Sequence, residues 1–240
     1  MARKLLLDGK RVWLKDYDER GYLRRGWNAL GNAIIGAMGA GILRAPPWHV
    51  GEAAKTVELR RLRELAAQGV LVPRVLGEGR GTLMLEDLGL TLGHQLRHAA
   101  DASLADALVG RALAAVADVH DRGGYLGQAF ARNMTVSDRG VGFIDFEEDP
   151  LEVMPLRDAQ ARDWLLFVAG LSSFYAGRGA ALSDLVVRLR PRIAADVADR
   201  VGQVAGRLAF LEPLTRRLWA DARAVGMAVA TLRGNFGVPE

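Results

Sequence analysis

The sequence predicts an α+β protein in two parts, a small strand-rich part over residues 1–88 and a mostly helical part over residues 89–240. Short strand-like runs separated by turn residues fill the first part. Long stretches rich in Ala and Leu, with apolar residues at helical spacing, fill the second part. The chain has 240 residues, 50% of them hydrophobic, so it is long enough to bury a core without disulfides.

The composition limits the kinds of metal site and of binding partner that the chain can have. The chain has no cysteine and only 4 histidines, which excludes a disulfide framework and a thiolate zinc site. Any metal is therefore expected to be a hard ion held by oxygen. The net charge of +4 comes from scattered arginines and indicates attraction to anions, such as phosphates or an anionic membrane face. The basic clusters lack interleaved aromatic residues, so no nucleic-acid partner is expected.

The sequence indicates a cytoplasmic protein, and a peripheral contact at the inner membrane is one of two interpretations of residues 26–43. Charged residues occupy the N-terminus where a signal peptide needs an apolar stretch, and no run is long enough for a spanning helix. Residues 26–43 carry no charged side chain and are dense in Gly and Ala. We expect this segment to pack closely on a surface, either the protein's own or a membrane interface.

The first part is expected to contain a hairpin, a helix and two more strands. Residues 3–17 form two strand-like runs around Asp8-Gly9, a dipeptide suited to a tight turn. Lys15 then lies near the end of the second strand. Residues 52–68 have an apolar stripe with helical spacing that includes Leu62 and Leu65, and Glu58 lies inside this helix. The remaining two strands are expected at residues 71–76 and 82–85, on either side of the turn-rich GEGRG.

The second part is expected to be helical apart from one hairpin. The expected helices cover residues 103–120, 158–175, about 182–210 and 213–232, with Pro191 kinking or dividing the third. The hairpin joins strands at 134–136 and 141–146 through a turn at residues 137–140.

Asn133 and Asp145 are the strongest candidates for a site. Asn133 precedes the first strand of that hairpin and Asp145 ends the second, so the two side chains are expected to converge. Amide and carboxylate oxygens are the ligands that Mg²⁺ takes in phosphoryl-transfer sites. The alternative is that Asn133 caps a turn and Asp145 is a solvated carboxylate.

The stretch GYLGQAFARNMTVSDRGVGFIDFEEDP resembles the lipopolysaccharide core (Kdo/heptose) kinase-like group of the protein-kinase-like superfamily. That group reads His-Gly-Asp-x-x-x-x-Asn and then Ile-Asp-Phe-Glu, which here become Leu126-Gly127-Gln128, Asn133 and Ile144 to Glu147. The resemblance implies a two-lobe kinase-like fold, with residues 1–88 as a reduced N-lobe and residues 89–240 as a helical C-lobe. It also implies ATP and Mg²⁺ as cofactors.

The resemblance implies roles for further residues. Lys15 is the expected phosphate contact and Glu58 its ion-pair partner, although a solvated lysine would read the same in the sequence. Glu86 and Leu88 fall where the family links its lobes and receives adenine. Asp163 is similar to the buried helix aspartate that braces the catalytic-loop backbone.

The chain departs from the family pattern at two places. Gln128 stands at the catalytic Asp position, and an amide cannot act as a general base. Asp149 and Glu147 are the nearby carboxylates that could substitute. Too few residues precede Lys15 for a glycine-rich phosphate loop between two strands.

Three functions remain open after the sequence is read. The first is a phosphotransferase acting on an envelope saccharide or lipid, with slow phosphotransfer or nucleotide hydrolysis. The second is a non-catalytic pseudokinase that senses nucleotide or lipid at the membrane face. The third is a helical scaffold that binds no nucleotide.

Overall fold

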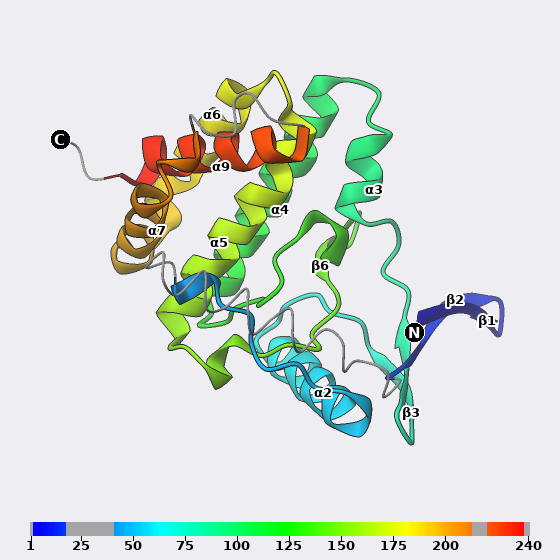
Figure 1. Cartoon of the computed structure of the whole chain (residues 1–240). Coiled ribbons are helices and arrows are strands. Elements are labelled where there is room, and N and C mark those ends of the chain that lie inside the picture. Colours follow the sequence, from blue (N-terminus) through cyan, green and yellow to red (C-terminus); the bar gives the residue numbers. More distant parts are fainter. Residues whose placement is uncertain (1, 18–40, 213–219, 238–240) are drawn as a thin grey trace.

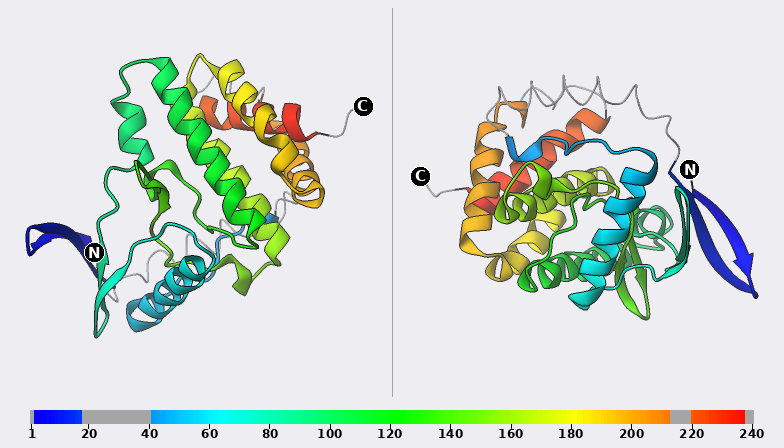
Figure 2. Two further views of the ribbon diagram at one scale, coloured as in Figure 1. Left: turned by 180° about the vertical axis from the view of Figure 1, so that it is seen from behind. Right: turned by 90° about the horizontal axis from the view of Figure 1, so that it is seen from below.

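A computed structural model describes residues 2–17, 41–212 and 220–237 and has the predicted α+β class (Figure 1). Strands and one long helix come first along the described chain, and helices dominate after residue 89. The long helix, α2 (Gly51–Ala67), lies beside the strand-rich end of the molecule, and the later helices form the opposite end (Figures 1 and 2).

The strand-rich end contains a four-stranded antiparallel sheet in the order β1-β2-β4-β3. Its strands are β1 (Ala2–Leu7), β2 (Lys10–Asp16), β3 (Val75–Gly79) and β4 (Thr82–Glu86). Positive φ angles of 48° at Asp8 and 74° at Gly9 make the predicted tight turn between β1 and β2. Trp13 pairs with Leu85 and Lys15 with Leu83, so β2 and β4 present these four side chains on one face.

Helix α2 confirms the predicted helix over residues 52–68 within one residue at each end. Its apolar stripe is buried and includes Leu62 and Leu65. Glu58 lies on the same buried face, which is unusual for a carboxylate and requires a partner inside the protein.

The predicted strand over residues 71–76 was wrong in position. The observed strand β3 begins at Val75 and takes in the first part of GEGRG, so that only Arg80 and Gly81 form the turn. Pro73 has no N–H group to donate to a neighbouring strand. The backbone before it is hydrogen-bonded to the second strand of the later hairpin instead. The carbonyl of Leu71 accepts a hydrogen bond of 2.9 Å from the N–H of Phe143.

The helical end follows the predicted pattern, including the division at Pro191, and adds one short helix. Its helices are α3 (Leu92–Arg97), α4 (Ala102–Asp121), α5 (Leu156–Ser172), α6 (Gly179–Leu189), α7 (Ala195–Arg207) and α9 (Ala220–Phe236). The short α3 was not predicted. The helix expected over 182–210 is divided by the 3₁₀ turn Arg190–Arg192, which contains Pro191. Of the helix expected over 213–232, residues 213–219 lie outside the described chain.

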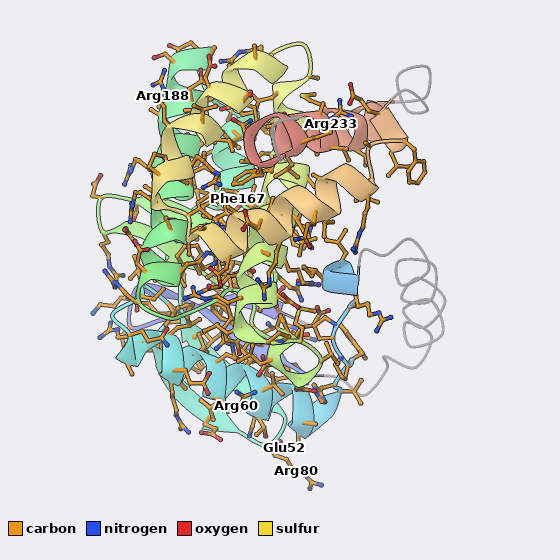
Figure 3. All side chains as sticks on the ribbon, turned by 90° about the vertical axis from the view of Figure 1, so that its left-hand side faces the viewer. Glu52, Arg60, Arg80, Phe167, Arg188 and Arg233 are labelled. Carbon is orange, nitrogen blue, oxygen red and sulfur yellow. The ribbon has the colours of Figure 1, made fainter. Side chains whose placement is uncertain are left out.

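The core of the helical end is formed around α5. This helix packs against α7 and α9, while α6 contacts α4 and α9. Phe167 of α5 is fully buried and lies in the middle of the helical end in Figure 3. The arginines Arg188 and Arg233 lie at the outside of the same end (Figure 3).

The predicted hairpin is present but its second strand is shorter. It consists of β5 (Met134–Ser137) and β6 (Gly140–Phe143), and the strand expected to reach residue 146 ends at Phe143. The backbone then turns at Asp145, whose φ of 70° is incompatible with a strand.

The segment expected at a membrane or partner surface, residues 26–43, lies outside the described residues except for its last three. Those three form a single 3₁₀ turn, Gly41–Leu43. In the part of the chain that the structure describes, no helix combines the length and the apolar character needed to span a bilayer.

Candidate functional site

A cavity of about 340 Å³ lies between the β2–β4 face of the sheet and the β5–β6 hairpin. Six of the residues predicted for the site line this cavity: Lys15, Glu58, Glu86, Leu88, Asn133 and Asp145. They come from separate strands, helices and loops, so tertiary folding has brought them together. Gln128 and Asp149 do not line it.

Lys15 lies at the polar end of the cavity in contact with three carboxylates. Its Nζ atom is 2.6 Å from Oε2 of Glu58, 2.7 Å from Oδ1 of Asp145 and 2.8 Å from Oε1 of Glu147. We call these four residues the Lys15 cluster. The hydroxyl of Tyr17 also donates to Oε2 of Glu58, at 2.5 Å. Lys15 is therefore not a solvated lysine, because it forms an ion pair with Glu58, as the resemblance implied.

The Lys15 cluster shifts the pKa of its members in ways that follow from burial and charge. Burial lowers the pKa of Lys15, but Glu58, Asp145 and Glu147 outweigh it and hold the pKa above its ordinary value. Burial raises the pKa of Glu58, and the ammonium of Lys15 offsets part of that rise. Burial, followed by the charge of Glu58, raises the pKa of Tyr17, so its hydroxyl stays a donor.

Asn133 and Asp145 meet at the same end of the cavity. The side-chain amide of Asn133 donates from Nδ2 to the carbonyl of Gln128 at 3.2 Å, which directs its Oδ1 away from that loop. Among the described residues this Oδ1 accepts no hydrogen bond. Asp145 adopts the left-handed conformation, with φ 70°, and its carboxylate is 38% exposed. A non-glycine residue held there points to a functional constraint.

These two side chains fit a magnesium ion better than the acidic cluster does. The carboxylates of Glu58, Asp145 and Glu147 offer oxygens within 4.8 Å of one another, but the ammonium of Lys15 already bonds to all three. Asn133 and Asp145 both line the cavity, and within the described residues Oδ1 of Asn133 and Oδ2 of Asp145, one neutral and one anionic, have no hydrogen-bond partner. Mg²⁺ is commonly held by one or two such protein oxygens together with water and phosphates.

The other end of the cavity is apolar and is formed by the chain that leaves β4. Leu88 is buried in its wall, with Leu85 and Ile144 beside it. The side chain of Glu86 turns outward, where Arg139 and Arg74 donate to it at 2.7 and 3.0 Å. Burial would raise the pKa of Glu86, but these two arginines hold it below its ordinary range.

The loop that carries Gln128 is braced from α5. Asp163 accepts hydrogen bonds from the N–H groups of Leu126 and Gly127, at 2.7 and 2.8 Å, which is the contact predicted for it. His120 approaches the same carboxylate at 3.1 Å. Gln128 itself is half-buried, and in the described part of the chain its side-chain amide makes no hydrogen bond. The loop backbone is therefore fixed, while the Gln128 side chain has no hydrogen-bond partner among the described residues and does not line the cavity.

Asp149 is not available as the substitute base that the sequence suggested. Its side chain is only 3% exposed, and it accepts hydrogen bonds of 2.6 Å from Arg60 and from Tyr125 and one of 2.9 Å from the N–H of Leu151. Burial would raise its pKa, but Tyr125 and Arg60 hold it below its ordinary value. Both oxygens of Asp149 accept hydrogen bonds, so this buried carboxylate stabilises the loops that it joins. Its lowered pKa also makes it a weak base.

Several residues of the site were missed in the sequence. Trp13 lines the cavity two residues before Lys15. Because residues two apart in a strand lie on the same face, the strand pattern could have predicted that Trp13 faces the same site as Lys15. Tyr17 was not singled out because its contact with Glu58 joins residues 41 positions apart. Thr91 and Thr135 also line the cavity, and nothing in their local sequence marks them.

A scan against protein-family models finds no match to this chain, and a search of curated proteins also finds none.

Proposed function

We propose that the cavity binds a magnesium nucleotide, ATP, and that the protein is kinase-like in fold and in site. The observation that supports this most is the convergence on one cavity of Lys15, Glu58, Asn133 and Asp145. The sequence indicated these residues separately, over a span from position 15 to position 145. A chance arrangement would not be expected to give both the Lys15–Glu58 ion pair and the two oxygen-bearing side chains of Asn133 and Asp145 at the same cavity.

Each part of a nucleotide has a chemically suitable place in the cavity. The ammonium of Lys15 suits the phosphates, and Glu58 holds it in position from α2. The apolar end with Leu85, Leu88 and Ile144 suits a base. Backbone groups near Glu86 and Leu88 are the expected hydrogen-bonding partners of adenine.

The proposed chemistry is transfer of the γ-phosphoryl group of ATP to a hydroxyl of an envelope saccharide or lipid, the acceptor class that the resemblance implies, with ADP as the leaving group and the hydroxyl proton passing to water. Asn133 and Asp145 would hold the magnesium ion, which neutralises charge on the phosphates when it is bound. Gln128 can orient an attacking hydroxyl or water through its amide but cannot take its proton. Because a positioned base contributes about 10²–10⁴ in rate, we expect turnover to be slow.

A second candidate function, a nucleotide sensor without catalysis, is favoured by Gln128 and by the state of Lys15. In the structure Lys15 already bonds to Asp145 and Glu147 as well as Glu58. Phosphates and magnesium would have to replace two of these contacts. Binding would therefore rearrange the Lys15 cluster, as a sensor requires.

Thermal denaturation with and without ATP and Mg²⁺ tests the proposal. Binding to the folded state raises the melting temperature, and a concentration of 100 times Kd stabilises by about 2.7 kcal/mol. Asp145→Asn should remove most of the shift. Asp138→Asn, an exposed change in the turn of the same hairpin, is the matched control and should keep it. No shift in the unmodified protein would contradict both candidate functions.

Nucleotide consumption then separates enzyme from sensor. Consumption is followed with and without an envelope-saccharide or lipid extract, in the unmodified protein and in Gln128→Asp. An enzyme should consume ATP slowly and gain about 10²-fold or more from the restored carboxylate. Consumption equal to buffer in both proteins, together with a thermal shift, would establish the sensor.

A further inference from the structure

The β1–β2 hairpin projects from the body of the protein and carries β1 at the edge of the sheet (Figures 1 and 2). Within the described residues, β2 is the only strand that pairs with β1. All six residues of β1 are exposed. Its last three are leucines, with exposed fractions of 40% for Leu5, 75% for Leu6 and 45% for Leu7.

The first half of this edge carries Arg3 and Lys4, but its last three residues lack the features that usually protect an edge strand. Natural edges carry a charge among the apolar residues, a proline or a bulge. The pairing of β1 with β2 runs without a register shift from Ala2 opposite Lys15 to Leu7 opposite Lys10. No proline or charge interrupts the three leucines. Residues 5–7 of the strand therefore present regular backbone donors and acceptors between apolar side chains.

We propose that β1 pairs in antiparallel orientation with β1 of a second copy of this chain, around a two-fold axis at Leu6. The turn at Asp8 and Gly9 has two residues with positive φ, so the flanking pair, Leu7 and Lys10, is the hydrogen-bonded one. Backbone groups of Leu5 and Leu7 then point to β2. Those of Lys4 and Leu6 point to the open edge, where they can pair.

The chemistry of the side chains selects the register. Centring the pair on Leu6 places Leu6 opposite Leu6 of the second copy and Leu5 opposite Leu7, and it brings Lys4 level with Asp8 in the turn of the second copy. A pair centred on Lys4 would place the two Lys4 ammonium groups opposite each other. A pair centred on Leu5 would place Lys4 opposite Leu6 of the second copy. The Leu6 register alone matches apolar with apolar and basic with acidic side chains. It is also self-complementary, as a two-fold interface must be.

A second strand fits this edge better than a lipid bilayer does. Unpaired backbone groups are costly in hydrocarbon, whereas an added strand satisfies them and places leucines beside the leucines of β1. The pairing joins two four-stranded sheets into one. Ala2 lines the cavity and Lys4 contacts Asp87 at 3.1 Å, so the seam borders the candidate site. The proposal does not rest on nucleotide binding.

Sedimentation equilibrium over a wide concentration range is the first test. The unmodified protein is expected to be a dimer. Leu6→Lys opposes two like charges at the axis and should weaken the dimer by at least about 100-fold, since like-charge contacts cost several kcal/mol. The matched control is Leu76→Lys on β3, at the other edge of the sheet, where Leu76 is 43% exposed. It should leave the dimer intact.

Disulfide cross-linking tests the register directly, because the chain has no cysteine of its own. In the proposed register the two copies of residue 6 form a hydrogen-bonded pair, with Cα atoms about 5.5 Å apart, which a disulfide can bridge. Leu6→Cys should therefore give a covalent dimer under mild oxidation. Leu5→Cys should not, since Leu5 faces Leu7 of the second copy. Circular dichroism shows that each variant is folded.

Three results would overturn the proposal. The first is an unmodified protein that stays monomeric at all concentrations. The second is cross-linking through Leu5→Cys in preference to Leu6→Cys. The third is a monomer that co-sediments with phosphatidylglycerol vesicles and loses this binding in Leu6→Lys, which would make the bilayer the occupant of the edge.

Discussion

Two carboxylate centres flank α2, and they differ in charge balance and in access. The Lys15 cluster has one ammonium among three carboxylates and opens to the cavity. Around Asp149 a single carboxylate bonds to Arg60 and Tyr125 and is sealed from solvent. Arg60 reaches it from α2, which Figure 3 shows at the outside of the strand-rich end. The first centre can accept a cation or exchange partners, whereas the second is complete as it stands.

The comparison separates residues that hold the structure from residues that can do chemistry. Both centres contain buried acids that a sequence cannot tell apart. An excess of charge beside a cavity indicates a ligand, because that excess costs stability unless something compensates it. A satisfied buried carboxylate indicates support for the loops it joins. The predictions below test this distinction.

The largest effect is expected from Lys15→Met. The change leaves three carboxylates close together without their ammonium, and removing one partner of a buried ion pair costs about 3–5 kcal/mol. The free energy of unfolding, measured with urea, should fall by this amount. Lys10→Met, at an exposed position of the same strand, is the control and should change it by less than about 0.5 kcal/mol. Equal effects of the two changes would contradict the role of the Lys15 cluster.

Asp149→Asn should destabilise the protein without changing its affinity for the proposed nucleotide. Losing hydrogen bonds to a charged group costs about 1–3 kcal/mol in the free energy of unfolding. The Kd for ATP with Mg²⁺ should stay within about twofold, or 0.4 kcal/mol. Asp145→Asn, whose carboxylate is 38% exposed, should show the reverse, with little loss of stability and loss of binding. A similar loss of binding in both variants would remove the distinction.

The contribution of Asp149 should disappear in acid. Its pKa is held below the ordinary value of 3.8, so its stabilisation is present above that pH and is lost as the pH falls through the folded-state pKa. Asp149→Asn lacks this dependence. The gap in unfolding free energy between the two proteins should therefore be constant near neutrality and close below pH 3.8. Urea denaturation across a pH series measures the gap, and a gap that persisted in acid would contradict the assignment.

The smallest effect is expected from Glu147→Gln. Glu147 contacts Lys15 at 2.8 Å, where it would compete with the phosphates of the proposed nucleotide for the ammonium. Removing its charge should tighten nucleotide binding by about fivefold, or roughly 1 kcal/mol. Titration calorimetry with ATP measures this. Glu152→Gln is a matched control, since Glu152 is 29% exposed and pairs with His49 instead. Weaker binding in Glu147→Gln would show that Glu147 supports the ligand rather than competing with it.

The sequence by itself determined the elements whose signals are local. The period of apolar residues placed α2, and the Asp8-Gly9 dipeptide placed the first turn. Pro191 marked the division between α6 and α7. Such features depend on neighbours within a few positions, so they can be read along the chain.

Tertiary structure decided which acids serve the cavity. The partners of Asp149 lie 24 and 89 positions away, and those of Lys15 lie 43 and 130 positions away. Folding over those distances sealed Asp149 with Arg60 and left Asp145 facing the cavity, although the two residues are only four positions apart in the chain. The difference is burial and pairing, which sequence spacing does not contain. It is also the reason that the Lys15 cluster, and not Asp149, is where a ligand is expected.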